Sequence, residues 1–370
     1  MSDDLLAGPR GRRICLELAR EVDERARHAL FELEYNADVA AGASIVRFGW
    51  TDDGGTFESR GPMDTTASTG DLAALIRSLP PVELTAPVID EALRRSVDFA
   101  RYWQPPDGAD LVAADPDVCA ALTAIAAQVT SHPAAEWWTR DRTERQWAVE
   151  FDSAGDLSPF ALPVDAAARW SDSTRAEEEQ AARERPTDPA ANFSGHWWSH
   201  PWGAPHTTGE RPDGVPTGIP YVEDGFGWTR AVAIPVAGGG RTYEIRSERD
   251  WAELCRRYPL EVTASRRHDW YRTTGRAGRW LLPDWGRVAG EWDAVHLTAW
   301  AYLTAATREI VVDDGYSSVI GGWAPDETYW LSGLVRPGAG APVVWTAGDP
   351  VGPWHRGAPR IRGLSPDSDA

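Results

Sequence analysis

The spacing of apolar residues predicts a helical start to the chain. Over residues 12–33 apolar side chains recur mostly three and four positions apart, which is typical of an amphipathic helix. Three more helices are expected, at residues 71–78, 88–102 and 116–130. Two short stretches have the composition of strands, residues 44–50 and 145–151, and the Asp-Asp-Gly-Gly that follows the first suits a hairpin turn.

The second half of the chain is expected to hold short strands separated by single helices. The predicted strands are residues 218–224, 230–236, 241–247, 293–298, 309–313 and 317–322. Helices are expected at residues 247–258, where Ser247 and Asp250 resemble a capping box, and from Asp284 onward. This pattern indicates an α+β fold with a mixed or antiparallel sheet. No G-x-G-x-x-G follows a strand, so a Rossmann fold is not expected.

Two polar stretches separate these parts of the chain. Residues 171–192 carry a dense run of charges, which predicts a solvated helix or a linker, and residues 193–218 are rich in Pro, Gly, His and Trp. We therefore expect two α+β domains, the first of them mostly helical. The expected bounds are residues 1–170 for the acidic N-terminal domain, 171–217 for the linker, 218–335 for the Trp-rich C-terminal domain and 336–370 for a Pro/Gly-rich tail.

The composition is that of a soluble globular protein, with 42% hydrophobic and 25% charged residues. No apolar run approaches the roughly 18 residues of a membrane span. The first residues lack the apolar stretch of a secretory signal, so we expect a cytoplasmic protein. The three cysteines lie far apart without a C-x-x-C motif, and His196, His200 and His206 stand among prolines. Neither pattern predicts a metal site or a disulfide framework.

All 37 basic residues are Arg. Without Lys the chain cannot form a Schiff base, a Walker A phosphate loop or a kinase strand lysine, which excludes PLP enzymes, P-loop NTPases and ordinary protein kinases. The net charge of −19 comes almost entirely from the first 240 residues. An acidic half repels phosphates, so the sequence argues against nucleic-acid binding and leaves a basic protein as a candidate partner.

Trp, Arg, His and carboxylates gather between Arg266 and Trp330. This stretch holds seven Trp, at positions 270, 280, 285, 292, 300, 323 and 330. Exposed indoles can stack on a flat ring, and paired guanidinium groups can hold a phosphate or a carboxylate. The candidate ligand-binding residues are Arg266, Arg267, His268, Trp270, Arg272, Trp285 and Trp292. The alternative is that the indoles form a core and the arginines form salt bridges within the protein.

Two adjacent pairs of indoles add a smaller signal, Trp137-Trp138 and Trp197-Trp198. On a strand both members of such a pair cannot face inward. One member of each pair is therefore expected to meet solvent, a partner or a ligand.

His296 and Glu327 are the candidate catalytic residues. His296 lies in the strand-like segment 293–298, where it could serve as acid, base or hydrogen-bond donor near neutral pH. Glu327 follows Asp326 in a segment framed by two tryptophans, and indoles around a carboxylate can raise its pKa into the range of general acid–base work. A hydrogen-bonded structural histidine and a solvated loop carboxylate are the alternatives.

Residues 218–335 resemble a module of Trp-rich proteins from actinomycete-type, high-GC bacteria. The resemblance rests on three elements: PDW at residues 283–285, WDAVHLT at residues 292–298 and a WxxDxTxWL-like element that begins at Trp323. That family carries no established activity, so the resemblance implies an origin and no reaction. The N-terminal half resembles no family.

Two functions follow as hypotheses. In the first, an enzyme binds a nucleotide-like or other flat anionic molecule in the C-terminal domain, with arginines on its phosphate and with His296 and Glu327 in proton or charge chemistry. The nearest concrete case is an ADP-ribosyltransferase-like domain, although the chain lacks an E-x-E pair and a His-Tyr-Glu order. In the second, the protein is a non-catalytic protein-binding or immunity-type module. No pattern identifies a cofactor.

Overall fold

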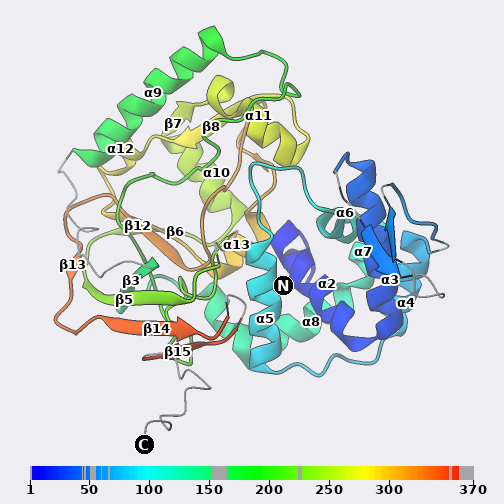
Figure 1. Ribbon diagram of the computed structural model, residues 1–370. Helices are drawn as coiled ribbons and strands as arrows, with labels where there is room; N and C mark the ends of the chain where they lie inside the picture. The colour runs from blue at the N-terminus through cyan, green and yellow to red at the C-terminus, as the bar shows by residue number, and fades with distance from the viewer. Residues whose placement is uncertain are drawn as a thin grey trace, which may run out of the picture.

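Helices and sheets occur together in the computed structural model, which confirms the α+β class (Figure 1). The description leaves out residues 1, 44, 46, 51–55, 60, 66, 152–164, 224–226, 350–351 and 358–370. For residues 2–3, 47–50 and 56–59 the structure gives the backbone only. No helix in the described ranges is long and apolar enough to cross a membrane.

The N-terminal part of the molecule is a bundle of helices (Figure 1). In chain order these are α1 (Ser2–Leu5), α2 (Pro9–Val22), α3 (Glu24–Ala40), α4 (Thr69–Ser78), α5 (Ala86–Asp98), α6 (Gly108–Ala114), α7 (Pro116–Ala121), α8 (Thr123–Ser131) and the 3-10 helix η1 (Pro133–Thr139). α2 packs against α3, α5, α6 and α8. It buries Ile14 and Leu18 together with Arg13, whose guanidinium is held by Glu17 at 2.7 Å.

The periodic stretch at residues 12–33 forms two helices and not the single helix that was predicted. Asp23 lies between them with an extended backbone (φ −143°), and its carboxylate accepts hydrogen bonds from the backbone N–H groups of Arg25 and Ala26. An N-cap of this kind starts a new helix, because its side chain accepts hydrogen bonds from backbone N–H groups. In a continuous helix these groups would donate to carbonyls of the preceding turn. The other predicted helices are present as α4, α5 and the pair α7–α8.

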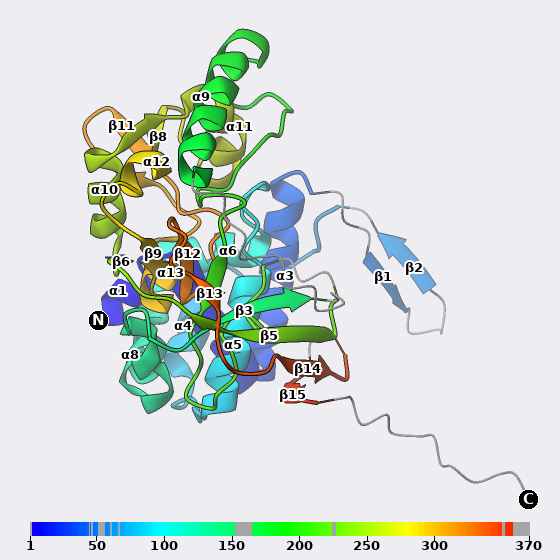
Figure 2. The same ribbon diagram turned by 90° about the vertical axis from the view of Figure 1, so that its left-hand side faces the viewer.

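A short hairpin stands at the edge of the helical part (Figure 2). Strands β1 (Arg47–Trp50) and β2 (Thr56–Ser59) pair antiparallel, as the sequence predicts, and the predicted turn between them lies outside the described residues.

The main sheet contains nine strands in the described part of the chain. These are β3 (Gln146–Phe151), β4 (His206–Thr208), β5 (Arg230–Ala237), β6 (Thr242–Ile245), β9 (Ala294–Leu297), β12 (Glu327–Trp330), β13 (Arg336–Pro337), β14 (Val343–Ala347) and β15 (Trp354–Arg356). Their order is β15-β14-β5-β3-β4-β12-β9-β6, with β13 also on β5. Only the β6–β9 pair within this set is parallel, so the sheet is mixed.

Strand β3 belongs to the segment assigned to the N-terminal domain, yet it lies between β5 and β4 in this sheet. The predicted tail likewise contributes three strands, β13, β14 and β15. One hydrophobic core extends from Leu5 in α1 to Leu331 after β12. The division into two domains therefore stays a prediction.

A second sheet, of four strands, and five further helices complete the described fold. The strands are β7 (Pro259–Glu261), β8 (Arg279–Pro283), β10 (Ile310–Val311) and β11 (Tyr316–Ser318), in the order β10-β11-β8-β7. The helices are α9 (Ala166–Glu184), α10 (Glu248–Arg257), α11 (Thr263–Thr274), α12 (Trp285–Val288) and α13 (Ala299–Ala305). α9 forms from the charged stretch and packs on α11 and α12, at the top of Figure 1.

The prediction of a strand at residues 218–224 is wrong for the residues that the structure describes. Residues 218–223 form turns and irregular backbone, and residue 224 lies outside the description. Pro220 has no N–H to give to a neighbouring strand, and its fixed φ suits a turn. This segment instead crosses to the helical bundle, where Tyr221 reaches α5.

Candidate functional site

The residues predicted to bind a ligand lie on three elements. Arg266, Arg267, His268, Trp270 and Arg272 are on α11, Trp285 begins α12, and Trp292 precedes β9. α11 ends at Gly275, whose positive φ of 73° is the usual left-handed stop of a helix. The helix distributes these five side chains around its axis, so they do not converge on one point.

The three α11 arginines of the predicted site bind groups of the chain itself. Their partners, in the order Arg266, Arg267 and Arg272, are the Glu177 carboxylate at 3.1 Å, the Thr187 carbonyl at 3.2 Å and the Phe193 carbonyl at 2.7 Å. These contacts join α11 to α9 and to the segment that follows α9. An anion bound there would have to compete with them.

His268 and two of the predicted indoles are buried. Burial and the neighbouring Arg267 charge lower the pKa of His268. Trp270 and Trp285 are fully buried, and their Nε1–H groups donate to the carbonyls of Trp197 and Ser199 at 2.8 and 3.2 Å. These indoles belong to the hydrophobic core.

Trp292 is the partly buried member of the predicted set. Its ring meets Tyr243 edge-on at 5.3 Å, and the Arg241 guanidinium lies 4.8 Å above it. A charge over an indole face is a favourable contact, and here an internal side chain supplies it.

His296 and Glu327 have different partners. Asp326, which contacts His296, directly precedes Glu327 on β12, and successive side chains point to opposite faces of a sheet. His296 is fully buried on β9, with Nδ1 2.6 Å from Glu244 and Nε2 3.2 Å from Asp326. Burial alone would lower the pKa of His296, but the hydrogen bonds and charges of these two carboxylates raise it to about 9. The imidazole is therefore a buried cation near neutral pH.

Glu327 is bound to a different histidine, His206 on β4. Its Oε1 lies 2.7 Å from His206 Nδ1, and its Oε2 accepts the Ala324 N–H at 2.8 Å. Burial would raise the pKa of Glu327, but the contact with His206 outweighs burial and lowers it. The same contact raises the pKa of His206. The His206 side chain is 55% exposed, so this pair reaches the surface.

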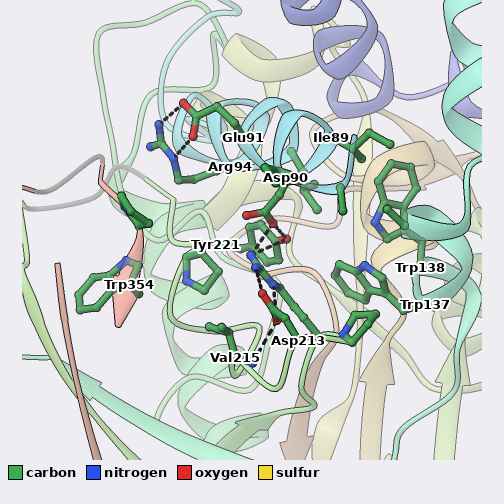
Figure 3. A pocket seen from close by; sticks show the side chains of 18 of the residues that line it. Ile89, Asp90, Glu91, Arg94, Trp137, Trp138, Asp213, Val215, Tyr221 and Trp354 are labelled. Atoms are coloured by element: carbon green, nitrogen blue, oxygen red, sulfur yellow. Dashed lines mark hydrogen bonds and ion pairs between the residues drawn. The ribbon is translucent and has the colours of Figure 1, made fainter. Parts of the chain in front are cut away.

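A large cavity lies elsewhere, between the helical bundle and the main sheet (Figure 3). We call it the aromatic pocket. Its volume is about 760 Å³, which lies in the range of small-molecule sites. Four segments far apart in the chain line it: residues 86–94 on α5, 132–138 around η1, 211–221 before β5, and 352–354 at the start of β15.

Aromatic rings and prolines form most of its walls. Trp137, Trp138, Tyr221 and Trp354 line it, and Trp137 stacks on Tyr221 with ring centroids 6.0 Å apart. Five prolines share the lining: Pro87, Pro133, Pro212, Pro220 and Pro353. Because proline fixes φ, these segments lose little backbone freedom when a ligand binds, and the pocket is preformed.

A network of charged side chains occupies the floor of the aromatic pocket (Figure 3). Arg211 Nη1 lies 2.5 Å from Asp90 Oδ1, and Arg211 Nε donates to Asp213 at 3.1 Å. The Tyr221 hydroxyl donates to the same Asp90 carboxylate. Burial and this carboxylate raise the pKa of Tyr221 well above its usual range, so the phenol stays protonated.

The sequence carried one signal for this pocket, the adjacent pair Trp137-Trp138. Both indoles are nearly buried on η1, which is not a strand, and both line the pocket. Nothing in the sequence places Asp90, Arg211 or Trp354 near them. Within the described residues, no group of three or more His, Cys, Asp or Glu could hold a metal ion.

No protein family, curated protein or solved structure was found to match the chain. The resemblance of residues 218–335 to a family of Trp-rich proteins therefore stays a prediction, as do the roles of His296, Glu327 and the α11 residues.

Proposed function

We propose that the protein binds a small, flat, largely apolar molecule in the aromatic pocket. The observation that carries this proposal is the preformed cavity of about 760 Å³, walled by four aromatic side chains and five prolines. Burial of a flat ring against indole and phenol faces supplies affinity, and a stacked aromatic pair adds about 0.5–1.5 kcal/mol beyond the buried area. The partly buried Trp354 is the wall residue most available for such stacking.

The charges of the lining favour a neutral or cationic ligand. Asp90, Glu91 and Asp213 stand against Arg94 and Arg211, in a chain of net charge −19. Each guanidinium is paired with a carboxylate of the same lining, so neither is available for an anion. A cation beside indole faces gains from the ring quadrupole.

Binding, and not catalysis, is what the composition of this pocket favours. Among the described residues that line it, there is no Ser, Thr, Cys or Lys. The one histidine, His132, caps η1 by accepting the Ala134 N–H at 3.1 Å. The carboxylates of the floor are engaged by Arg211 and Tyr221. A role in sensing or carrying a small molecule therefore fits better than a reaction in this cavity.

Three indoles of matched shape test the proposal: neutral indole, cationic tryptamine and anionic indole-3-acetate. The melting temperature should rise with tryptamine and with indole, and far less with indole-3-acetate, since ligand binding stabilises the folded state. Trp354→Ala should weaken binding roughly tenfold, through loss of stacking and burial. Trp202→Ala removes a 65% exposed indole elsewhere and is the matched control. Equal shifts for all three probes, or an unchanged response in Trp354→Ala, would contradict the proposal.

A second candidate function, acid–base catalysis, rests on His206. A half-exposed imidazole whose Nδ1 is held by a buried carboxylate resembles the histidine–carboxylate pairs of acid–base sites. Glu223 adds to this candidate: burial and then the nearby charge of Glu327 raise the pKa of Glu223 well above its usual range. Two carboxylates whose pKa values are pushed apart are typical of acid–base sites.

A panel of chromogenic esters, phosphates and glycosides tests this second candidate. Turnover that is lost in His206→Gln and retained in His355→Gln, an exposed histidine on β15, would support it. Turnover that survives in His206→Gln, or none at all with the wild type, would remove it. If a pull-down instead returns one stoichiometric basic protein, the non-catalytic binding module becomes the better account.

A further inference from the structure

A second cleft differs from the aromatic pocket in that arginines form much of its lining. Its volume is about 200 Å³, and ten of its seventeen lining residues are charged or carry a hydroxyl group. It lies where α2, the segment between α5 and α6, the end of α11 and the turn after α13 meet. We call it the arginine cleft, after its four arginines: Arg10, Arg12, Arg101 and Arg308.

The carboxylates of the arginine cleft are already neutralised. Asp107 and Asp110 both contact Arg13, at 2.9 and 3.3 Å, and Asp110 is also bound by Arg10. The third acid of the lining, Glu309, holds Arg276 at 2.7 Å. The acids therefore do not cancel the remaining positive charge.

Two guanidinium groups of the lining stay without a carboxylate partner among the described residues. Arg12 donates to the carbonyls of Leu6 and Ala7 at 3.0 and 3.2 Å, and its buried Nε has no hydrogen-bond partner in the described ranges. Arg101 is exposed, and its guanidinium lies 5.5 Å from the Phe99 ring, with no hydrogen bond or ion pair of that guanidinium in the described part of the chain. Arg308, in contrast, is paired with Glu248.

The electrostatic setting of Arg12 is unfavourable without a counter-charge. Burial lowers the pKa of Arg12, and the charges of Arg10 and Arg308 act in the same direction, while the charge of Asp110 offsets this only in part. A bound anion would relieve both effects, because it supplies the missing charge where guanidinium groups lack one.

The backbone at the cleft is strained as well. Thr307 has a positive φ of 61°, a value that β-branched residues rarely adopt, and its hydroxyl contacts the Ala306 carbonyl at 2.6 Å. Strained residues of this kind gather at ligand sites, where the surrounding structure holds them in place. Thr307, Thr273 and Thr274 line the same cleft as Arg12 and Arg101.

We propose that the arginine cleft binds a small oxyanion, a phosphoryl group or a carboxylate, between Arg12 and Arg101. The volume suits one such group and a few neighbouring atoms, and Arg is the side chain that holds planar and tetrahedral oxyanions by paired hydrogen bonds. The site is independent of the aromatic pocket: the lining residues differ, and so does the charge of the ligand.

Inorganic phosphate is the probe, added to the full chain at constant ionic strength. Isothermal titration should give saturable binding, and thermal shift should rise with the same concentration dependence. Acetate in parallel distinguishes a site for phosphoryl groups from one for carboxylates. Either response supports the proposal, and the absence of saturable binding by both anions overturns it.

Arg101→Met removes one exposed guanidinium and leaves the buried contacts of α2 intact. It should weaken phosphate or acetate binding at least tenfold. Arg249→Met removes an exposed arginine of α10 and should leave the affinity unchanged. Arg12→Met, checked for native circular dichroism, should abolish binding. An affinity that survives in Arg101→Met, or that falls equally in Arg249→Met, overturns the proposal.

Discussion

Asp90 and Tyr221 are 131 positions apart in the chain, and the Tyr221 hydroxyl donates a hydrogen bond to the Asp90 carboxylate. The same carboxylate binds Arg211 at 2.5 Å. Helix α5 and the segment that leads into β5 are thereby joined at the floor of the aromatic pocket. The contact holds together two of the four segments that line the pocket.

Loss of Arg211 should therefore loosen this junction. Arg211→Met leaves Asp90 and Asp213 without their shared cation, and we expect the free energy of unfolding to fall by about 2 kcal/mol. Urea denaturation measures the change, with Arg249→Met as the control at an exposed position. An equal loss in both variants would mean that the network adds nothing specific.

The buried cation at His296 should make stability depend on pH. Its pKa of about 9 in the folded protein lies above the usual value near 6.5, so its stabilisation is complete below about pH 6.5 and is lost as the pH rises through about 9. The difference in free energy of unfolding between wild type and His296→Gln should shrink by about 3 kcal/mol between about pH 6 and pH 10.

Other titrating groups cancel in that difference, because both proteins contain them. His355→Gln should track the wild type over the whole range, since His355 is exposed on β15. A constant difference between wild type and His296→Gln would show that His296 is not a buried cation.

His206 should titrate above the ordinary range because Glu327 holds it. The imidazole resonances of His206 in NMR spectra should give a raised pKa in the wild type. In Glu327→Gln the pKa of His206 should fall, since the neutral amide no longer stabilises the imidazolium. A pKa that is the same in both proteins would remove the basis of the second candidate function.

Local features of the fold could be predicted from the sequence, because they depend on neighbours in the chain. The helices α4, α5 and α10 and the strands β3, β5, β6 and β9 lie close to their expected places. The break at Asp23 was missed because apolar periodicity continues across it, while the cap is set by one side chain. The strands β14 and β15 were missed because they lie in a stretch rich in Pro and Gly.

The sequence does not predict which strands pair with β3. Their identity provides a test of the predicted division into two domains. All six residues of β3 pair with β5, and Gln146 accepts a hydrogen bond from Thr207 at 2.8 Å. We expect residues 171–370, expressed alone, to give a poorly dispersed amide spectrum, because β5 and β4 lose the strand between them. A well-dispersed spectrum of that fragment would instead support the predicted two domains.

The candidate site was harder to predict than the fold. In the segment from Arg266 to Trp330, the indoles of Trp270 and Trp285 belong to the core. The α11 arginines of the predicted site bind α9 and the segment after it. Residue types alone do not distinguish a side chain that is available to a ligand from one that already contacts another group of the protein. The aromatic pocket is assembled from four distant segments, and a single sequence contains no information on such pairing.

A crystal structure after soaking with indole, tryptamine and indole-3-acetate, each in turn, tests the central claim most directly. The account predicts electron density for indole and tryptamine in the aromatic pocket, with the ring against Trp354 or Tyr221 and the tryptamine ammonium toward Asp90 or Glu91. It predicts none there for indole-3-acetate. An empty aromatic pocket with all three compounds, or a pocket that takes the acid in preference to the amine, would contradict it.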